Sequence, residues 1–402
     1  MDDSSLARYA DAIVRDGLRI GPGDVLSVHP EPVQRPFAVA LTEAGYRAGA
    51  RYVDVLEDDP RITRARALLA PEETLDWRPA WQDARMRELV RENAGIVWIA
   101  GAEDPQALAD VPPARAVRKV VDRPGLAPYR RAVGRGDARF AVVAWPTPAW
   151  AAQVYPELSP EAALATLGND LLRFARIGAG DPPDGWRVHA ESLAERARTL
   201  TELDVRELHL RAPGTDLRLT FPPGTLWRGG VADARGHRIT PNIPTEEVFT
   251  SPAPGATSGP FRCTRPLAIA GRVITGIAGE FRGGRLVRIE ADGDEDREFL
   301  ASYFARDRGA GRLGELALVD DSSRVGQAGR PYFTTLLDEN AAAHMAFGMG
   351  FGDARSPGGP AVNRSMIHID VMIGSPEMDV DAVDGSGRTL SIIADGSFAS
   401  GL

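Results

Sequence analysis

Helical and strand-like patterns alternate through roughly the first 150 residues. The short apolar runs "DVLSV", "YVDV", "IVWIA" and "FAVVA" are separated by helical segments such as "RPFAVALTEAGYRAGA" and "MRELVRENAG". Strands that alternate with helices pair in parallel, and the helices then pack on the faces of the sheet. We therefore expect residues 1–200 to form an N-terminal three-layer α/β domain with a mostly parallel sheet.

The pattern changes at about residue 200, after the helical segment "WRVHAESLAERARTLTELD". "RELHLRAPGTDLRLTFPPG" is typical of a hairpin, and "LAIAGRVITGIAGEFRGGRLVRIEADG" of strands joined by glycine turns. "EDREFLASYFARD" is one of the few helical patterns in this half. We expect residues 201–402 to form a second, mixed α+β domain.

Charge and composition exclude several classes of protein. The chain has 47 basic and 56 acidic residues, mostly interleaved, with a net charge of −9. Nucleic acids and anionic membranes favour a basic face, so neither is expected as a partner. No run approaches the ~18–20 apolar residues that span a bilayer, and the N-terminus lacks the basic region of a signal peptide. We expect a cytoplasmic protein, in which the single cysteine, Cys263, is a small buried hydrophobe.

One glycine-rich segment matches a nucleotide-binding motif in its letters alone. "GAGRLG" at 309–314 matches G-x-G-x-x-G, but it follows a helical pattern and precedes the strand-like "ELALV". A dinucleotide site needs the reverse order, strand and then helix. We expect a glycine-rich turn here.

Two polar residues lie inside the apolar run "SMIHIDVMIG". Its β-branched residues predict a buried strand, in which side chains two apart share a face, so His368 and Asp370 project together. Burial of both requires a partner. A His–Asp hydrogen bond and a divalent metal ion both satisfy this requirement.

Other polar residues in apolar surroundings favour the metal ion. In "DENAAAHMAFG", Asp338 resembles the N-cap of an Ala-rich helix that contains His344. Glu315 lies in the strand-like "LGELALV", and Glu246 and Glu247 are neighbours in "NIPTEEVFTSP", where adjacent side chains face opposite ways. Each feature alone fits a structural or solvent-exposed residue. Together they offer the nitrogen and oxygen ligands of two divalent ions.

The order of these segments resembles the M29 family of metallo-aminopeptidases. T-E-E-V-F-T, G-E-x-A-L-V, D-E-N-A-x-x-H and N-R-S-x-I-H-x-D-x-M-I-G occur in the family order, and the resemblance covers essentially the whole chain. It implies a cytoplasmic, two-domain and usually dimeric exopeptidase with a two-metal site in the C-terminal domain. Short peptides as substrates and a homodimer follow as expectations.

The same resemblance implies the metal ligands. In the family pattern carried onto this sequence, Glu315 is expected to bridge two divalent ions (Zn, Co, Mn or Mg). Glu247 and His344 are expected to complete one site, and His368 and Asp370 the other. The choice of Glu247 over Glu246 depends on family-like spacing to Glu315. A bridging carboxylate fits ions held about 3.5–4 Å apart.

One residue departs from the family pattern. The family has a tyrosine seven residues after the histidine that corresponds to His344, and this chain has Phe351 there. The tyrosine hydroxyl belongs to the family's active-site set. Either the donor is lost, with another such as Tyr332 replacing it, or the glycine-rich segment shifts the alignment and Phe351 is a packing residue.

The leading hypothesis is metal-dependent hydrolysis that releases N-terminal residues from short peptides, with Glu246 as the candidate that transfers a proton to the leaving amine. A ring-cleaving dihydroxypyridine dioxygenase of similar fold is the first alternative, with one iron held by His344, His368 and Asp370. Glu247 and Glu315 favour two metals over that mononuclear site. A catalytically altered relative that only binds metal or peptide is the second alternative.

Overall fold

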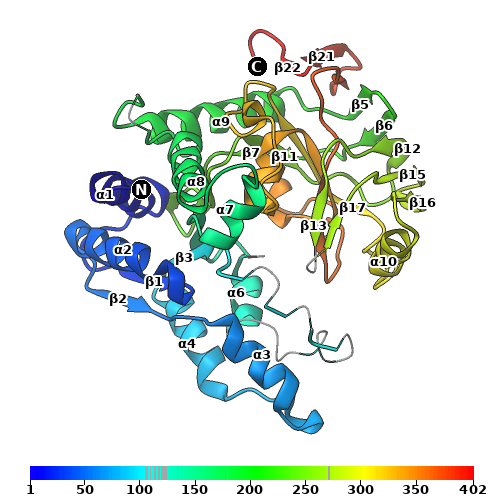
Figure 1. The fold of residues 1–402 in the computed structure, drawn as a ribbon. Coiled ribbons are helices and arrows are strands. Elements are labelled where there is room, and N and C mark those ends of the chain that lie inside the picture. The colour runs from blue at the N-terminus through cyan, green and yellow to red at the C-terminus, as the bar shows by residue number, and fades with distance from the viewer. Residues whose placement is uncertain are drawn as a thin grey trace. The chain divides into compact units, whose positions relative to one another are not determined.

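The computed structural model describes residues 1–402 except 105–106, 109, 113–114, 116–117, 119–124, 134, 179 and 270–271. The chain divides into two units (Figure 1). Unit 1 comprises Met1–Arg187 and Ala232–Pro244, and unit 2 comprises Val188–Val231 and Thr245–Leu402. Whether a boundary near residue 200 separates parts that fold by themselves stays a prediction.

Unit 1 is built on a sheet with the strand order β10-β4-β3-β1-β2. All of its neighbouring strands pair in parallel, which confirms the expected parallel sheet. The strands of unit 1 are β1 (Val25–His29), β2 (Tyr52–Val55), β3 (Gly95–Ala100), β4 (Arg139–Ala144), β8 (Ala232–Ala234), β9 (His237–Ile239) and β10 (Asn242–Ile243). Its helices include α1 (Asp3–Asp11), α2 (Arg35–Ala48), α3 (Pro60–Leu69), α4 (Ala80–Arg91), α6 (Leu126–Val133), α7 (Pro148–Val154) and α8 (Pro160–Phe174).

Both faces of this sheet are apolar and covered by helices. Leu26 and Val97 project to one face, where they belong to a core shared with α1 and α2. Val25 and Ile96 project to the other face and pack with α4 and α6. Successive residues of a strand face opposite sides, so strands covered on both sides read as continuous apolar runs. The three-layer arrangement expected from the sequence is confirmed.

One edge strand of this sheet comes from much later in the chain. Asn242 and Ile243 of β10 pair with Val142 and Val143 of β4. The side chain of Ile243 is fully buried in the core on the α1 and α2 side. The segment Ala232–Pro244 therefore completes unit 1, although unit 2 both precedes and follows it in sequence.

Unit 2 contains two large antiparallel sheets around one core, and a two-stranded antiparallel sheet besides. The strand orders of the two large sheets are β19-β18-β17-β11-β7 and β16-β15-β12-β6-β5-β20-β21-β22. The hairpins expected from the alternating segments are present as β5–β6 and β15–β16, and the expected helix is α10, while the turn at 270–271 lies outside the described residues. Cys263 packs against the core, and burial raises the pKa of its thiol.

The elements of unit 2 begin with the long helix α9, which starts at the end of unit 1. They are α9 (Gly185–Glu202), β5 (Glu207–Ala212), β6 (Thr215–Thr220), β7 (Arg228–Gly229), β11 (Glu247–Thr250), β12 (Thr257–Arg262), β13 (Leu267–Ile269), β14 (Arg272–Ile274), β15 (Ala278–Arg282), β16 (Arg285–Glu290), α10 (Asp294–Phe304), β17 (Leu313–Val319), α11 (Thr335–Asp338), β18 (His344–Gly348), β19 (His368–Met372), β20 (Asp379–Val383), β21 (Thr389–Ala394) and β22 (Ser397–Phe398). Segment 309–312 of "GAGRLG" forms turns between α10 and β17, as expected.

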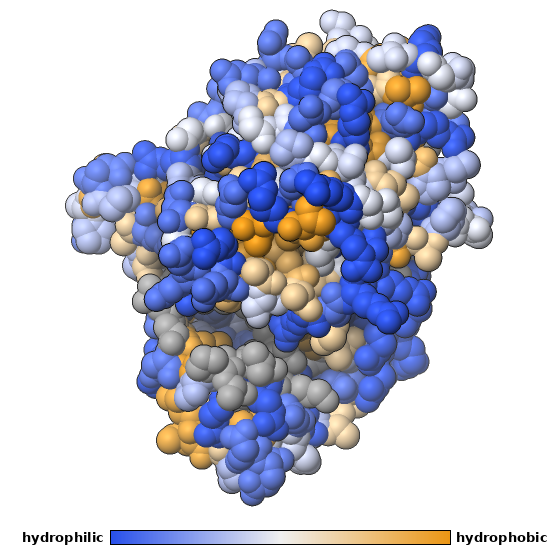
Figure 2. Space-filling model, turned by 90° about the vertical axis from the view of Figure 1, so that its right-hand side faces the viewer, coloured by the Kyte–Doolittle hydropathy of each residue, from blue (hydrophilic) through white to orange (hydrophobic). Residues whose placement is uncertain are grey.

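No helix among the described residues is both long and apolar enough to cross a bilayer. The face drawn in Figure 2 is mostly hydrophilic, and its apolar areas are small and interrupted by hydrophilic ones. Such small apolar areas are ordinary on a protein surface.

Candidate metal centre

Four adjacent strands of unit 2 present polar side chains on one face of their sheet. Glu315 of β17 and Asp370 of β19 both lie opposite Ala346 of β18 in the strand register. His344 of β18 lies opposite Ala317, while Glu247 of β11 lies opposite Val319. Because side chains alternate along each strand, these residues share a face with His368. Small alanine side chains occupy two of the positions between them.

The other face of the same strands is apolar. It carries Leu316 and Leu318 of β17, Met345 and Phe347 of β18, and Ile369 and Val371 of β19, which are all buried in the core of unit 2. Burial of this face fixes the strand register, because a slip by one residue would turn the polar set into the core. Hydrophobic packing therefore positions the polar cluster.

The polar cluster consists of two overlapping triads. Glu247, Glu315 and His344 form one, and Glu315, His368 and Asp370 form the other, with one potential ligand atom of each residue within 4.8 Å of the others in its triad. His344 Nε2 lies 3.0 Å from Glu247 Oε2, and His368 Nε2 lies 3.1 Å from Glu315 Oε2 and 3.3 Å from Asp370 Oδ1. The structure thus brings together all five residues expected as ligands, with Glu315 common to both triads.

Backbone carbonyls orient both imidazole rings. His344 Nδ1 lies 3.3 Å from the carbonyl oxygen of Ala342, and His368 Nδ1 lies 2.8 Å from that of Met349. A carbonyl only accepts, so Nδ1 is the donor in each pair. This second contact fixes the ring and directs Nε2 towards the carboxylates, as in metal-binding histidines.

The donor set fits divalent cations. Oε2 of Glu247 is buried and makes no hydrogen bond, although His344 Nε2 is only 3.0 Å away. Burial raises the pKa of Glu315, and the neighbouring Glu247 carboxylate raises it further. Burial alone would lower the pKa of His344, but Glu247 outweighs it and raises the pKa to about 10. The neighbouring carboxylates thus favour the protonated forms of Glu315 and His344, whereas burial is outweighed at Asp370, where the two histidines lower the pKa. Bound cations would supply the positive charge that these protons otherwise provide.

Glu246 lies apart from these triads. Its Oε2 is 3.3 Å from His189 Nε2 on α9, and its backbone N–H donates to Asn340 Oδ1 at 2.7 Å. The opposite orientation of neighbouring residues explains why Glu247 and not Glu246 joins the cluster. The catalytic role expected for Glu246 stays a prediction.

The expectation that His344 lies on an Ala-rich helix is wrong. Helix α11 ends at Asp338, a 3₁₀ turn covers Glu339–Ala341, and His344 is the first residue of β18. Asp338 accepts the backbone N–H groups of Tyr332 and Thr334 instead of capping a following helix. Pairing of β18 with both β17 and β19 outweighs the helical preference of the alanines.

One buried carboxylate was missed by sequence analysis. Glu339 is buried, and its pKa is raised well above the usual range by burial and then by the charges of Asp370 and Glu247. The signal available in the sequence was its place in "DENAAAH", directly before Asn340, which is buried in the structure. Glu339 therefore adds a further acidic group to the surroundings of the triads.

Phe351 lies against the cluster. Its ring centroid is 5.1 Å from that of His368, in an edge-on arrangement, and 5.2 Å from that of Phe249. Its backbone N–H donates to Ser251 Oγ. Tyr332, the alternative donor, is fully buried. Phe351 therefore packs on one of the expected ligands.

Comparisons with known proteins identify the family of the chain. A family model described as thermophilic metalloprotease (M29) matches residues 2–398. The chain belongs to the M29 family. It is 36% identical to aminopeptidase T of Thermus thermophilus over 98% of each chain, and 34% identical to aminopeptidase 2 of Geobacillus stearothermophilus over 99% of this chain and 98% of that one.

Solved structures extend the comparison. The structure of wild-type AmpT from Thermus thermophilus superposes with a TM-score of 0.87 at 34% identity, covering 98% of this chain and 99% of that one. The 2,5-dihydroxypyridine dioxygenase of Pseudomonas putida KT2440 gives a TM-score of 0.56 at 12% identity over 100% and 98% of the two chains, which is a likeness of fold alone. As an M29 member, the chain is a peptide hydrolase of the metallo-aminopeptidase type that uses divalent metal.

Proposed function

We propose that this M29 protein releases N-terminal residues from short peptides with the help of two divalent ions held side by side in unit 2. The observation that carries the proposal is the pair of triads that share Glu315 on one sheet face. A shared carboxylate is what two neighbouring cations need to offset their mutual repulsion.

Each residue of the cluster has a distinct place in this proposal. Glu315 contributes to both sites, Glu247 and His344 complete one, and His368 and Asp370 complete the other. Nitrogen and oxygen donors of this kind suit Zn, Co, Mn or Mg. Ions bound there would polarise the scissile carbonyl and activate the hydrolytic water.

Two carboxylates are candidates for proton transfer to the leaving amine. Glu246 contacts His189 at 3.3 Å, which gives it a titratable neighbour. Glu339 is buried among the acidic residues of the triads. The acidic surroundings also attract the positively charged amino group of a peptide, which supports a preference for free N-termini.

Metal content and substrate form test the proposal together. We expect two equivalents of divalent metal per purified chain by inductively coupled plasma mass spectrometry. We also expect cleavage of a short peptide with a free amino group and at least tenfold slower cleavage of its N-acetylated form. One iron per chain would favour the mononuclear alternative, and equal cleavage of the two peptides would indicate endopeptidase or amidase chemistry.

A cytoplasmic homodimer completes the proposal, following the M29 resemblance. Light scattering of the purified protein measures the oligomeric state directly. A monomer across the concentrations used for activity would contradict that part alone.

A further inference from the structure

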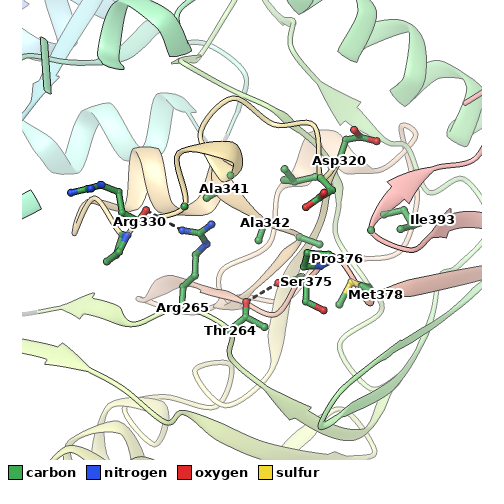
Figure 3. A pocket seen from close by; sticks show the side chains of 18 of the residues that line it. Thr264, Arg265, Asp320, Arg330, Ala341, Ala342, Ser375, Pro376, Met378 and Ile393 are labelled. Carbon is green, nitrogen blue, oxygen red and sulfur yellow. Dashed lines mark hydrogen bonds between the residues drawn. The ribbon is translucent and has the colours of Figure 1, made fainter. Parts of the chain in front are cut away.

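A cavity of about 380 Å³ lies off one end of the sheet that carries the triads (Figure 3). It is lined by residues at the end of β17, just before β18 and just after β19, among them Val319, Ala342 and Ser375. Its charged lining residues are Arg265, Arg330, Asp320 and Asp321. Its size is at the small end of ligand-binding pockets, roughly 300–1,000 Å³.

The cavity lies close to the Glu247 and His344 end of the cluster. Val319, one of its lining residues, is the cross-strand partner of Glu247. Ala342, another, is extended and its carbonyl oxygen lies 3.3 Å from His344 Nδ1. Directly opposed residues of an antiparallel pair have Cβ atoms about 4.5–5.5 Å apart. The cavity is therefore bordered by direct neighbours of Glu247 and His344.

Arg265 contributes a cationic side chain to this cavity. Its side chain extends between the labelled alanines and Arg330, and Nη1 donates to the carbonyl oxygen of Arg330 at 3.1 Å (Figure 3). Over the part of the chain that the structure describes, its guanidinium makes no other hydrogen bond and no ion pair. Burial lowers its pKa, although the charge of the nearby Asp338 acts in the opposite sense. The Asp338 carboxylate accepts the backbone N–H groups of Tyr332 and Thr334 and forms no ion pair with Arg265 in the described part of the chain. A partly buried guanidinium of this kind is stabilised by a carboxylate or phosphate group.

Two acidic residues, Asp320 and Asp321, line the cavity, and backbone donors already engage Asp320. Oδ1 of Asp320 accepts the backbone N–H of Ser322 at 3.0 Å, and Oδ2 accepts that of Phe398 at 2.8 Å. These bonds lower the pKa of Asp320 against the opposing effect of burial. Asp320 therefore has structural partners of its own and does not neutralise Arg265.

We propose that Arg265 binds the C-terminal carboxylate of the substrate, so that the cavity receives the residues that follow the cleaved bond. This inference rests on the proposed aminopeptidase function and names its substrate class, namely di- and tripeptides with a free C-terminus. The carboxylate pairs with the guanidinium while the amino end of the same peptide reaches the triads. Longer peptides place their carboxylate beyond this limited space.

Three substrates separate this inference from the proposed function. The metal-loaded full chain is assayed with Leu-Gly-Gly, with its C-terminal amide, and with leucine p-nitroanilide, which has no carboxylate. We expect kcat/KM for the free acid to exceed that for the amide by roughly tenfold or more, mainly through KM, because one charge-assisted pair is at stake. In Arg265→Gln the loss is at least tenfold larger for the acid than for the amide, and Arg265→Lys restores part of the difference.

The matched control is Arg218→Gln, because Arg218 is an exposed residue of β6 that does not line the cavity. We expect this variant to keep the wild-type ratio of kcat/KM for the acid to that for the amide. If wild type and Arg265→Gln give the same ratio of acid to amide while leucine p-nitroanilide is still hydrolysed, the role of Arg265 is overturned and the aminopeptidase proposal stands. If the wild type hydrolyses none of the three, the aminopeptidase proposal fails. Calorimetric titration of both peptides then decides, since equal affinities for acid and amide overturn the role of Arg265. Should Arg265→Gln not fold, the wild-type ratio and Arg265→Lys carry the test.

Discussion

Glu315 is the residue on which both proposed ion sites depend. It belongs to both triads and lies 3.1 Å from His368. We predict that Glu315→Ala loses both equivalents of metal, because each ion loses a ligand and the shared negative charge. His368→Ala should lose chiefly one equivalent. Metal analysis after gel filtration measures both.

The exposed Glu298 on α10 offers a matched control, and Glu298→Ala should retain two equivalents. Circular dichroism checks that each variant folds. Two equivalents retained by folded Glu315→Ala would show that this carboxylate does not bridge.

Phe351 allows a test by gain of function. Its ring centroid lies 5.1 Å from that of His368, so Phe351→Tyr adds a hydroxyl to a ring that contacts an expected ligand. One donor to a developing oxyanion is typically worth about 10²–10³ in rate. We predict that Phe351→Tyr raises kcat for an aminoacyl substrate at least tenfold with metal content unchanged.

Phe249→Tyr is the control, because it adds a hydroxyl to the ring that packs against Phe351. An unchanged or lower rate in Phe351→Tyr would mean that Phe351 is a packing residue of an otherwise complete site.

At the scale of elements, Asn340 secures the start of β11. It is fully buried, accepts the N–H of Glu246 at 2.7 Å and donates to the carbonyl of Leu336 at 2.8 Å. Glu247 is the next residue along β11. We predict that Asn340→Ala costs about 1–3 kcal/mol of unfolding free energy, because a buried N–H loses its acceptor, and weakens metal binding as well. Denaturant unfolding of the metal-free protein and metal titration measure the two effects.

Ser323→Ala separates these effects, because Ser323 Oγ donates to the carbonyl of Asn340 and leaves Glu246 untouched. It should reduce stability and spare metal affinity. Equal losses of metal affinity in both variants would contradict a positioning role for Asn340.

Elements with strong local patterns were predictable, and those that depend on distant pairing were not. The apolar runs of β1, β3 and β4 and the alternating hairpins carry their own periodicity. His368 and Asp370 could be placed on one face of a strand for the same reason. His344 could not, since alanines favour a helix locally and only β17 and β19 make this segment a strand. Glu339 escaped because its burial arises from tertiary packing.

At the scale of the molecule, bound metal and bound protons compete for the same groups. The pKa of His344 is about 10 without metal, so its proton remains at neutral pH and must leave when a cation binds. Each displaced proton makes apparent metal affinity rise about tenfold per pH unit below that pKa. Ligands that bind only the folded state raise its stability.

We therefore predict that a fixed metal concentration raises the melting temperature more at pH 8.5 than at pH 6. Scanning calorimetry with metal and with chelator at each pH gives the two shifts. His344→Gln, which carries no titratable proton, should show a weaker pH dependence. Equal shifts at both pH values in the wild type would contradict the competition.

The assignment of segment 232–244 to unit 1 also lay beyond sequence analysis. β10 consists only of Asn242 and Ile243, and its place beside β4 depends on Val142 and Val143, which lie 100 positions earlier. So short a strand has no periodicity of its own. A division of the chain by composition therefore places it with its sequence neighbours.

The late arrival of β10 bears on how the nascent chain acquires its structure on the ribosome. Domains generally fold as they emerge, N-terminal first. Here β4 has no neighbour on its outer side until residues 242–243 have been synthesised, after the whole of Val188–Val231. An unpaired strand edge is a template for pairing with other chains. During translation the parallel sheet thus stays open along β4, and this interval is when a chaperone would matter most.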